Sequence, residues 1–185
     1  RPVFGAARAR ARRTACTNNL RQIGQAVQMY LQDYEKQRPF ELAALAPKYG
    51  ASAELLACPS DPHRAEGGWM GSYKKVLYPT MGEPADYPTS YGDWSLLYSN
   101  KLWRYLERQS GRPGYVVCVT HGERPERDRP PFWYTGPALR LCFDGGVVAI
   151  ANQPSRPLAI DHWGLLTGQK PSERPAWYES GKGRS

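Results

Sequence analysis

The stretch RPVFGAARARARRTACTNNLRQIGQAVQMYLQDY, residues 1–34, decides how this chain folds. Proline occurs at Pro2, where the first turn of a helix tolerates it, and next at Pro39. An uninterrupted helix over residues 2–34 would be about 50 Å long. Its apolar residues recur at three- and four-residue steps, as an amphipathic helix requires: Val3, Ala7, Ala11, Ile23, Ala26, Val27, Tyr30, Leu31 and Tyr34.

The apolar face of this helix is thin over residues 5–15 and rich over residues 20–34. We therefore expect the second half to pack on the domain that follows and the first half to project from it. A projecting half-helix needs a partner outside the chain, because it gains little from its own domain. The candidate contact residues are Val3, Phe4, Ala7, Arg8, Ala11 and Arg12.

The run from Pro2 to Glu35 resembles the segment after the membrane helix in bacterial prepilin-type proteins, the type IV pilin and type II secretion pseudopilin group. Within that group it is similar to pseudopilin-like proteins that carry CPSD and a C-terminal H-X9-DG element. The chain has ACPSDP at residues 57–62 and FDGGV at residues 143–147, in the expected order. The motif residues are Pro59, Ser60, Asp61, Asp144 and Gly145.

The chain departs from that pattern in two features. It lacks the roughly 20-residue apolar stretch of a membrane helix, and we expect it to start almost where such a stretch would end. His121 lies 23 residues before Asp144, so the H-X9-DG spacing is absent. The resemblance implies an exported protein without a cofactor, either anchored in the inner membrane and facing the periplasm or part of an extracellular filament.

The predicted fold is α+β and type IV pilin-like, with the long helix packed on a small antiparallel sheet among extensive loops. Seventeen prolines and 18 glycines in 185 residues indicate short elements and much ordered loop. The predicted organisation is a helix over residues 1–34, a globular domain over residues 35–168 and a polar tail over residues 169–185.

The sheet is expected to contain apolar runs that are separated by turn signals. An Asp-Gly step such as Asp144-Gly145 between two of these runs is a strong hairpin signal. The expected strands are residues 115–120, 139–143 and 147–151. Further elements are a short helix within residues 39–50, a strand at residues 71–79 and a partial helix from about Ser95.

The formal net charge of +8 suggests affinity for anionic surfaces. Residues 1–13 hold five arginines and no acidic residue. Beside a membrane, lipid headgroups would stabilise each arginine by about 1 kcal/mol. DNA binding through these arginines and exposed aromatic side chains is a weaker alternative, because no RRM, KH or OB signature accompanies them.

Four cysteines fit two disulfides if the chain is exported. Three pairings are open, and placement favours Cys16 with Cys58 and Cys118 with Cys142. The first bond would staple the helix to the segment that folds back, and the second would join two apolar strands. Zinc is the competing interpretation and is disfavoured, because no C-x2-C pair occurs and the cysteines are 42, 60 and 24 positions apart.

Two constellations invite a catalytic or metal-binding interpretation. Cys118, His121 and Asp144 would serve as nucleophile, base and orienting acid. However, Cys118 and His121 point to opposite faces if the strand continues through them. Asp61 and His63 would bind a cation, although Ser-Asp-Pro is first a turn signal. We therefore expect no catalytic residue and no metal site.

These observations predict a non-enzymatic pilin- or pseudopilin-like subunit that assembles through its N-terminal helix into a pilus-like filament or a type II secretion pseudopilus. Its partners would be other subunits and the inner membrane. The main alternative is an envelope-anchored binding module, in which the helix is a stalk and aromatic loops bind a ligand or DNA. A hydrolase is the third hypothesis for the function of this chain. The aromatic residues concerned are Tyr73, Tyr78, Tyr87, Tyr91 and Trp94.

Overall fold

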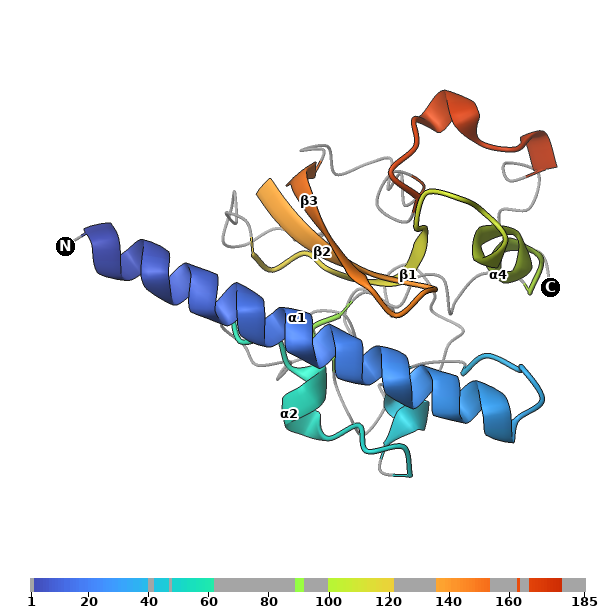
Figure 1. Cartoon of the computed structure of the whole chain (residues 1–185), viewed down its shortest axis with the longest axis horizontal. Helices are drawn as coiled ribbons and strands as arrows, with labels where there is room; N and C mark the ends of the chain where they lie inside the picture. Colours follow the sequence, from blue (N-terminus) through green and yellow to red (C-terminus); the bar gives the residue numbers. More distant parts are fainter. Residues whose placement is uncertain are drawn as a thin grey trace, which may run out of the picture.

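The computed structural model describes residues 2–39, 42–46, 48–61, 89–91, 100–121, 136–153, 163 and 167–177. A long N-terminal helix packs against a three-stranded antiparallel sheet, so the predicted α+β fold is confirmed (Figure 1). The described elements are α1 (Pro2–Asp33), the 3-10 helix η1 (Leu42–Leu45), α2 (Ala53–Leu56), α4 (Asn100–Glu107), β1 (Gly114–Cys118), β2 (Gly136–Cys142), β3 (Val147–Gln153) and the 3-10 helix η3 (Pro171–Glu173).

Helix α1 covers the interval predicted for it. It ends where Glu35 and Lys36 take positive φ values of 50° and 65°, outside the range of a right-handed helix. The Lys36 N–H donates to the Leu31 carbonyl over 2.7 Å and closes the last turn. Among the described residues, no helix combines the length and the apolar character that crossing a membrane requires. The fully buried stripe of α1 is Cys16, Leu20, Ile23, Ala26 and Val27.

The sheet order is β1-β2-β3, and both pairs are antiparallel. The predicted hairpin joins β2 to β3. Gly145 has a φ of 79°, which glycine adopts without strain, and its N–H donates to the Cys142 carbonyl over 3.0 Å. The Asp144 Oδ1 atom accepts the Gly146 N–H over 2.8 Å. The Asp-Gly step therefore turns the chain as its sequence predicted.

The two faces of the sheet pack against different helices, because successive strand residues alternate sides. Val116 and Cys118 belong to the core that includes the buried stripe of α1, whereas Val117 packs with the α4 residue Leu106. A Cβ atom built on Gly24 would lie 3.1 Å from a methyl group of Leu141. Glycine at this position therefore lets α1 approach β2 closely.

The segment after α1 contains two short helical turns. The helix expected within residues 39–50 is the 3-10 helix η1 in the described part of that range. Helix α2 begins after Ser52, whose hydroxyl accepts the Leu55 N–H over 3.2 Å and caps the turn. The strand predicted at residues 71–79 lies outside the described residues.

The C-terminal part of the partial helix predicted from about Ser95 is α4. Residues 92–99 lie outside the described part of the chain, so the start of that prediction is not tested. Within the predicted polar tail, Trp177 contacts Tyr105 of α4 edge-on, with ring centroids 5.3 Å apart. This part of the tail therefore contacts the domain.

Candidate functional site

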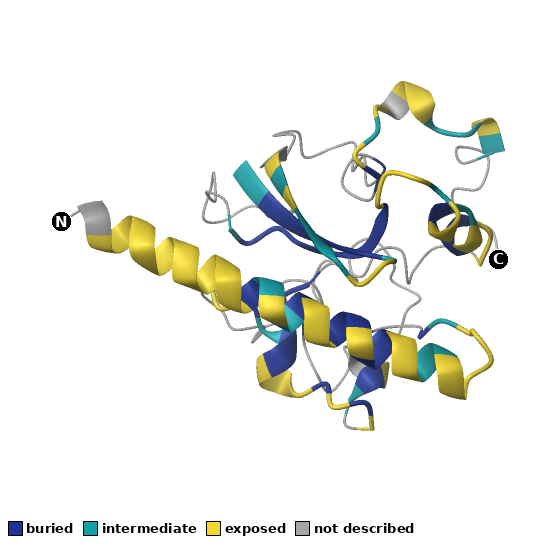
Figure 2. Ribbon diagram, viewed as in Figure 1, coloured by how far each residue is buried: buried dark blue, intermediate teal, exposed yellow. Residues whose placement is uncertain are grey.

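The first feature that points to a function is the exposed half-helix, residues 4–15 of α1. Every residue in it is exposed, and Phe4 at its start is 73% exposed (Figure 2). Between Phe4 and Cys16 the sequence holds only glycine, alanine, arginine and threonine. No large apolar side chain is available there to pack on the domain, so this half of α1 stands clear of it.

Phe4, Ala7 and Ala11 lie on one side of the exposed half-helix. Nine residues make about two and a half turns of helix, so Ala7 is half a turn from Cys16, and Ala11 is half a turn from Leu20. The stripe therefore faces away from the side of α1 that the domain covers. The side chain of Val3, which was predicted with this group, lies outside the described residues.

The exposed half-helix also carries four arginines, and no acidic residue occurs in it. Arg8 and Arg12 are one turn apart, where like charges oppose helix formation. The Thr14 hydroxyl donates to the Arg10 carbonyl over 3.1 Å and so bonds only within the helix. All described side chains of the exposed half-helix are exposed, so burial against the domain does not offset this repulsion.

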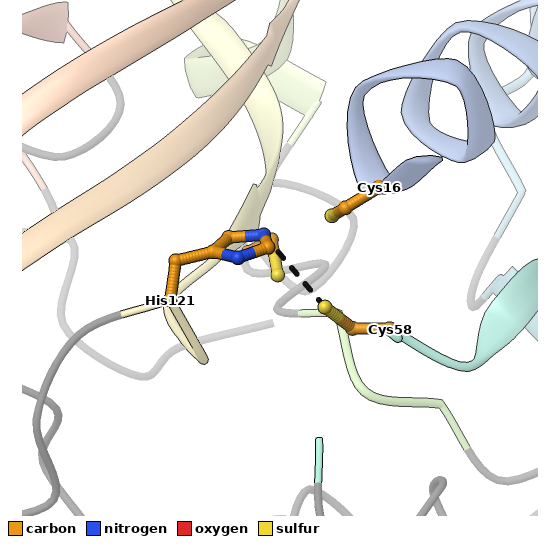
Figure 3. A group of neighbouring side chains, drawn as sticks. Cys16, Cys58 and His121 are labelled. Atoms are coloured by element: carbon orange, nitrogen blue, oxygen red, sulfur yellow. Dashed lines mark hydrogen bonds between the residues drawn. The ribbon is translucent and has the colours of Figure 1, made fainter. Parts of the chain in front are cut away.

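The second feature is a cluster of four potential metal ligands, here called the Cys3His cluster. The four ligand atoms all lie within 4.8 Å of one another. Figure 3 shows side chains from α1, from the segment after α2 and from the segment after β1 converging on one point. The cysteines are buried and the histidine is half-buried. The members are Cys16, Cys58, Cys118 and His121.

Local structure places the first two members. Cys16 is the first buried residue among the described side chains of α1, at the point where the helix meets the domain. The Asn19 side-chain amide donates to the Ala57 carbonyl over 3.4 Å and holds the segment of Cys58 against α1. After Cys58 the chain turns, and the Asp61 N–H donates to the Cys58 carbonyl over 2.9 Å.

A turn places the histidine on the same side as Cys118, contrary to the sequence expectation. That expectation assumed a strand running through His121, but β1 ends at Cys118 and a turn follows at Thr120 and His121. The His121 Nε2 atom lies 3.7 Å from the Cys58 sulfur. Its Nδ1 atom lies 3.1 Å from the Ser60 hydroxyl, so one ring nitrogen faces the thiols and the other a fixed hydroxyl.

Polar groups surround the sulfur atoms. The Ser60 N–H donates to the Cys58 sulfur over 3.4 Å, and the Thr120 hydroxyl lies 3.2 Å from the Cys118 sulfur. The Tyr91 hydroxyl lies 3.7 Å from the Cys16 sulfur. The Cys16 thiol donates to Tyr91, so the thiols are packed among polar groups of both kinds in a buried site.

The shared environment separates the acidities of the thiols. Hydrogen bonding with Cys118, and then with Cys16, holds the pKa of the Cys58 thiol well below its usual range. Burial, followed by the neighbouring thiols, raises the pKa of Cys118. The surroundings therefore favour ionisation of Cys58 over ionisation of Cys118.

All four cysteines are free thiols in the structure, and the predicted pairing of Cys118 with Cys142 is overturned. The register pairs Cys142 with Gly114 and Cys118 with Leu139. The two cysteines therefore lie four strand positions apart, about 13 Å, whereas a disulfide requires Cα atoms within about 7 Å. Cys142 instead lies with its sulfur 3.1 Å from the Arg112 carbonyl.

The sulfur atoms of Cys16 and Cys58, the other predicted pair, are at most 4.8 Å apart, and both residues are free thiols in the structure. The covalent bond between them stays a prediction. The expectation of no metal site stays a prediction, although four potential ligands that are far apart in the sequence converge. Spacing between cysteines could not show this, since the fourth ligand is a histidine and each segment contributes one or two ligands.

The other candidate residues do not form a second site among the described residues. Asp144 lies beyond the far end of β2 and pairs with Arg112, with 2.8 Å between Oδ2 and Nε, so the Cys118–His121–Asp144 triad that was considered and disfavoured from the sequence is not assembled. The Asp61 Oδ2 atom accepts the Ser90 hydroxyl over 2.6 Å. His63, its suggested partner for a cation, lies outside the described residues.

The aromatic loops of the binding-module alternative are mostly outside the described residues. Tyr91 is described and is fully buried beside Cys16, so it does not belong to an open ligand surface. Tyr73, Tyr78, Tyr87 and Trp94 are not described.

One family profile matches the chain, over residues 5–41. The family is described as "Protein of unknown function (DUF1559)", and its members are prepilin- and pseudopilin-like bacterial proteins. The match covers most of α1 and is compatible with a pilin-like surface protein. It does not extend to the DG motif at Asp144. No curated protein and no solved structure matches the chain significantly.

Proposed function

We propose that this chain is a pilin- or pseudopilin-like subunit that assembles through the exposed half-helix of α1 into a pilus-like filament or a secretion pseudopilus. The single observation that supports this most is the exposure of all residues from Phe4 to Ala15 on a helix whose other half is packed. Helices from neighbouring subunits would cover the exposed half-helix and form the core of the filament.

The shape of the exposed stripe suits such packing. Ala7 and Ala11 are one turn apart, and small side chains allow helix backbones to approach closely. Phe4 adds an apolar side chain on the same side, which neighbouring helices would remove from water. The stripe faces away from the domain, so the domain would remain on the outside of a helical bundle.

The arginines of the exposed half-helix suit a position beside a membrane. In this proposal the protein is exported, and a preceding apolar helix anchors it in the inner membrane before assembly. Anionic headgroups would attract the arginines at about 1 kcal/mol each and hold the unassembled helix at the surface. Other subunits and the membrane are the proposed partners, and no enzymatic activity is part of this proposal.

The test is the double substitution Ala7→Glu/Ala11→Glu in the protein expressed in its own host. The expected result is loss of the subunit from the sheared filament fraction, because two carboxylates would be buried between helices. The melting temperature of the domain should not change, since both positions are exposed. The matched control is Ala149→Glu/Ala151→Glu, the same chemical change at two exposed alanines of β3.

Normal incorporation of the Ala7→Glu/Ala11→Glu variant would contradict the proposal. The exposed half-helix would then be a stalk, and an envelope-anchored binding module would become the better description. Loss of incorporation in both double variants would contradict it too, because the defect would then not be specific to the helix.

A further inference from the structure

We propose that the Cys3His cluster binds one zinc ion, which fastens α1 to the domain at the residue where the exposed half-helix begins. This inference is independent of filament assembly and rests on the described side chains alone. The cluster joins three segments that are distant in sequence: α1, the turn after α2, and the end of β1 with the turn that follows it (Figure 3).

The distances suit tetrahedral coordination. Zinc lies about 2.3 Å from thiolate sulfur and about 2.0 Å from imidazole nitrogen, so two ligand atoms on one ion are about 3.5–3.8 Å apart. The Cys58 sulfur and His121 Nε2 are 3.7 Å apart. All other ligand pairs lie within 4.8 Å, so the longest needs to shorten by about 1 Å.

The kind of ligand favours zinc over other common cations. Three thiolates and one imidazole form a soft donor set, whereas magnesium and calcium require oxygen ligands. Four protein ligands complete the coordination shell, which is typical of a structural zinc site and leaves no position for a substrate. The burial of the cysteines agrees with this role.

The groups around the ligands would orient them and offset their charge. The Ser60 hydroxyl at His121 Nδ1 fixes the ring so that Nε2 faces the sulfurs, as the second partner of a metal-bound histidine usually does. Three thiolates, one neutral imidazole and Zn²⁺ carry a net charge of about −1. The Ser60 N–H and the Thr120 hydroxyl adjoin two of the sulfurs and would stabilise this charge.

The proposal gives Ser60 in the CPSDP motif a role that a turn alone does not explain. It contacts two ligands, through its backbone at Cys58 and through its hydroxyl at His121. Ser60 would therefore be a positioning residue for the metal. Replacing it with alanine should weaken zinc binding about 10- to 100-fold.

The experiment uses the 185-residue chain, purified with a reductant, freed of metal with a chelator and then supplied with Zn²⁺ or Co²⁺. We expect one zinc per chain by elemental analysis and a cobalt spectrum typical of tetrahedral thiolate coordination. Competition with a chromophoric chelator then gives the affinity. Zinc should raise the melting temperature, because it binds the folded chain at a site formed by three segments.

The variants separate ligands from other cysteines. Cys142→Ser is the matched control: it removes a buried cysteine outside the cluster and should bind zinc like the wild type. Cys58→Ser and His121→Ala should weaken binding by more than about 100-fold, beyond the loss expected for a supporting residue. His121 is half-buried, so His121→Ala tests the site even if Cys58→Ser does not fold.

Ser60→Ala should bind zinc less tightly but melt like the wild type without metal, a difference that a merely structural role would not produce. Three outcomes would overturn the proposal. They are substoichiometric zinc in the reduced chain, equal zinc binding by the wild type and His121→Ala, and a Cys16–Cys58 disulfide in protein isolated without reductant from its own compartment. The disulfide excludes zinc at this site, because it consumes two of the four ligands.

Discussion

The two halves of α1 share one continuous helix but differ in what keeps them helical. The exposed half-helix, residues 4–15, has no buried side chain, whereas residues 16–27 place five fully or almost fully buried side chains against the domain. The change occurs within a single residue step, at Cys16. Before Cys16 the sequence consists mostly of alanine and arginine. From Cys16 onward, large apolar residues recur on one side of the helix.

The difference shows that continuity of a helix does not imply uniform stability. Most helical stability in proteins comes from packing an amphipathic face, and short unsupported helices are marginal in water. The second half of α1 should therefore unfold only with the domain. The exposed half-helix should open separately, at low free energy, until another surface covers it.

The largest expected effect comes from truncating a buried side chain in the packed half. Ile23 is fully buried, so Ile23→Ala should lower the free energy of unfolding by about 3 kcal/mol. Phe4→Ala removes a larger side chain from the exposed half-helix. It should nevertheless change the free energy of unfolding by less than about 0.5 kcal/mol. Urea denaturation of both variants measures the difference. If Ile23→Ala and Phe4→Ala lowered the free energy of unfolding by similar amounts, the two halves of α1 would unfold together.

Substituting one glycine in each half of α1 should change stability by an intermediate amount. A Cβ atom at Gly24 would meet Leu141, whereas one at Gly5 would have nothing within 4 Å. Gly24→Val should therefore lower the free energy of unfolding by about 1–3 kcal/mol, because the added side chain overpacks the contact between α1 and β2. Gly5→Val should leave the melting temperature of the domain unchanged. If Gly24→Val is as stable as the wild type, α1 does not depend on close approach to the sheet.

The smallest effect is expected at the C-terminal end of α1, where Asp33 forms an exposed ion pair with Lys48. The Asp33 carboxylate lies 3.0 Å from the Lys48 ammonium and accepts the Tyr49 hydroxyl over 2.8 Å. Hydrogen bonding to Lys48, and then to Tyr49, lowers the pKa of Asp33 from its ordinary value of 3.8. A lowered carboxyl pKa stabilises the folded state above the unfolded pKa, and that contribution is lost as the pH falls through the folded pKa.

The measurement compares the melting temperatures of Asp33→Asn and the wild type across pH. The variant should melt slightly lower at pH 7, because it loses an exposed and therefore screened ion pair. The gap should begin to close below about pH 4 and continue to close as the pH falls through the lowered pKa of Asp33. A gap that widens in acid would contradict the assignment of this carboxylate.

The sequence was informative wherever structure depends on neighbouring residues. The three- and four-residue spacing of Ile23, Val27 and Tyr30 predicted α1, and the Asp144-Gly145 step predicted the β2–β3 hairpin. Both signals are local, since periodicity and turn chemistry act over a few positions. The alternation of Val116 and Val117 between two cores then follows from the geometry of a strand.

The Cys3His cluster could not be predicted in the same way. Its members meet because β1 ends at Cys118 and the chain turns back at His121, and a run of apolar residues does not reveal where a strand stops. The pairing of Cys118 with Cys142 failed for a related reason. Two apolar strands can be recognised as neighbours, but their register, which pairs Cys142 with Gly114, depends on the bulge after Gly114.

The position of Cys16 has a mechanical consequence. A force applied to the exposed half-helix along its axis loads the whole buried stripe in shear, so the contacts from Cys16 to Val27 resist together. A force applied sideways peels the helix from its first attached residue, and that residue is Cys16. A cross-link at this point, by metal or by disulfide, would strengthen the weaker of the two directions. The chain would then resist bending of its projecting arm as well as pulling on it.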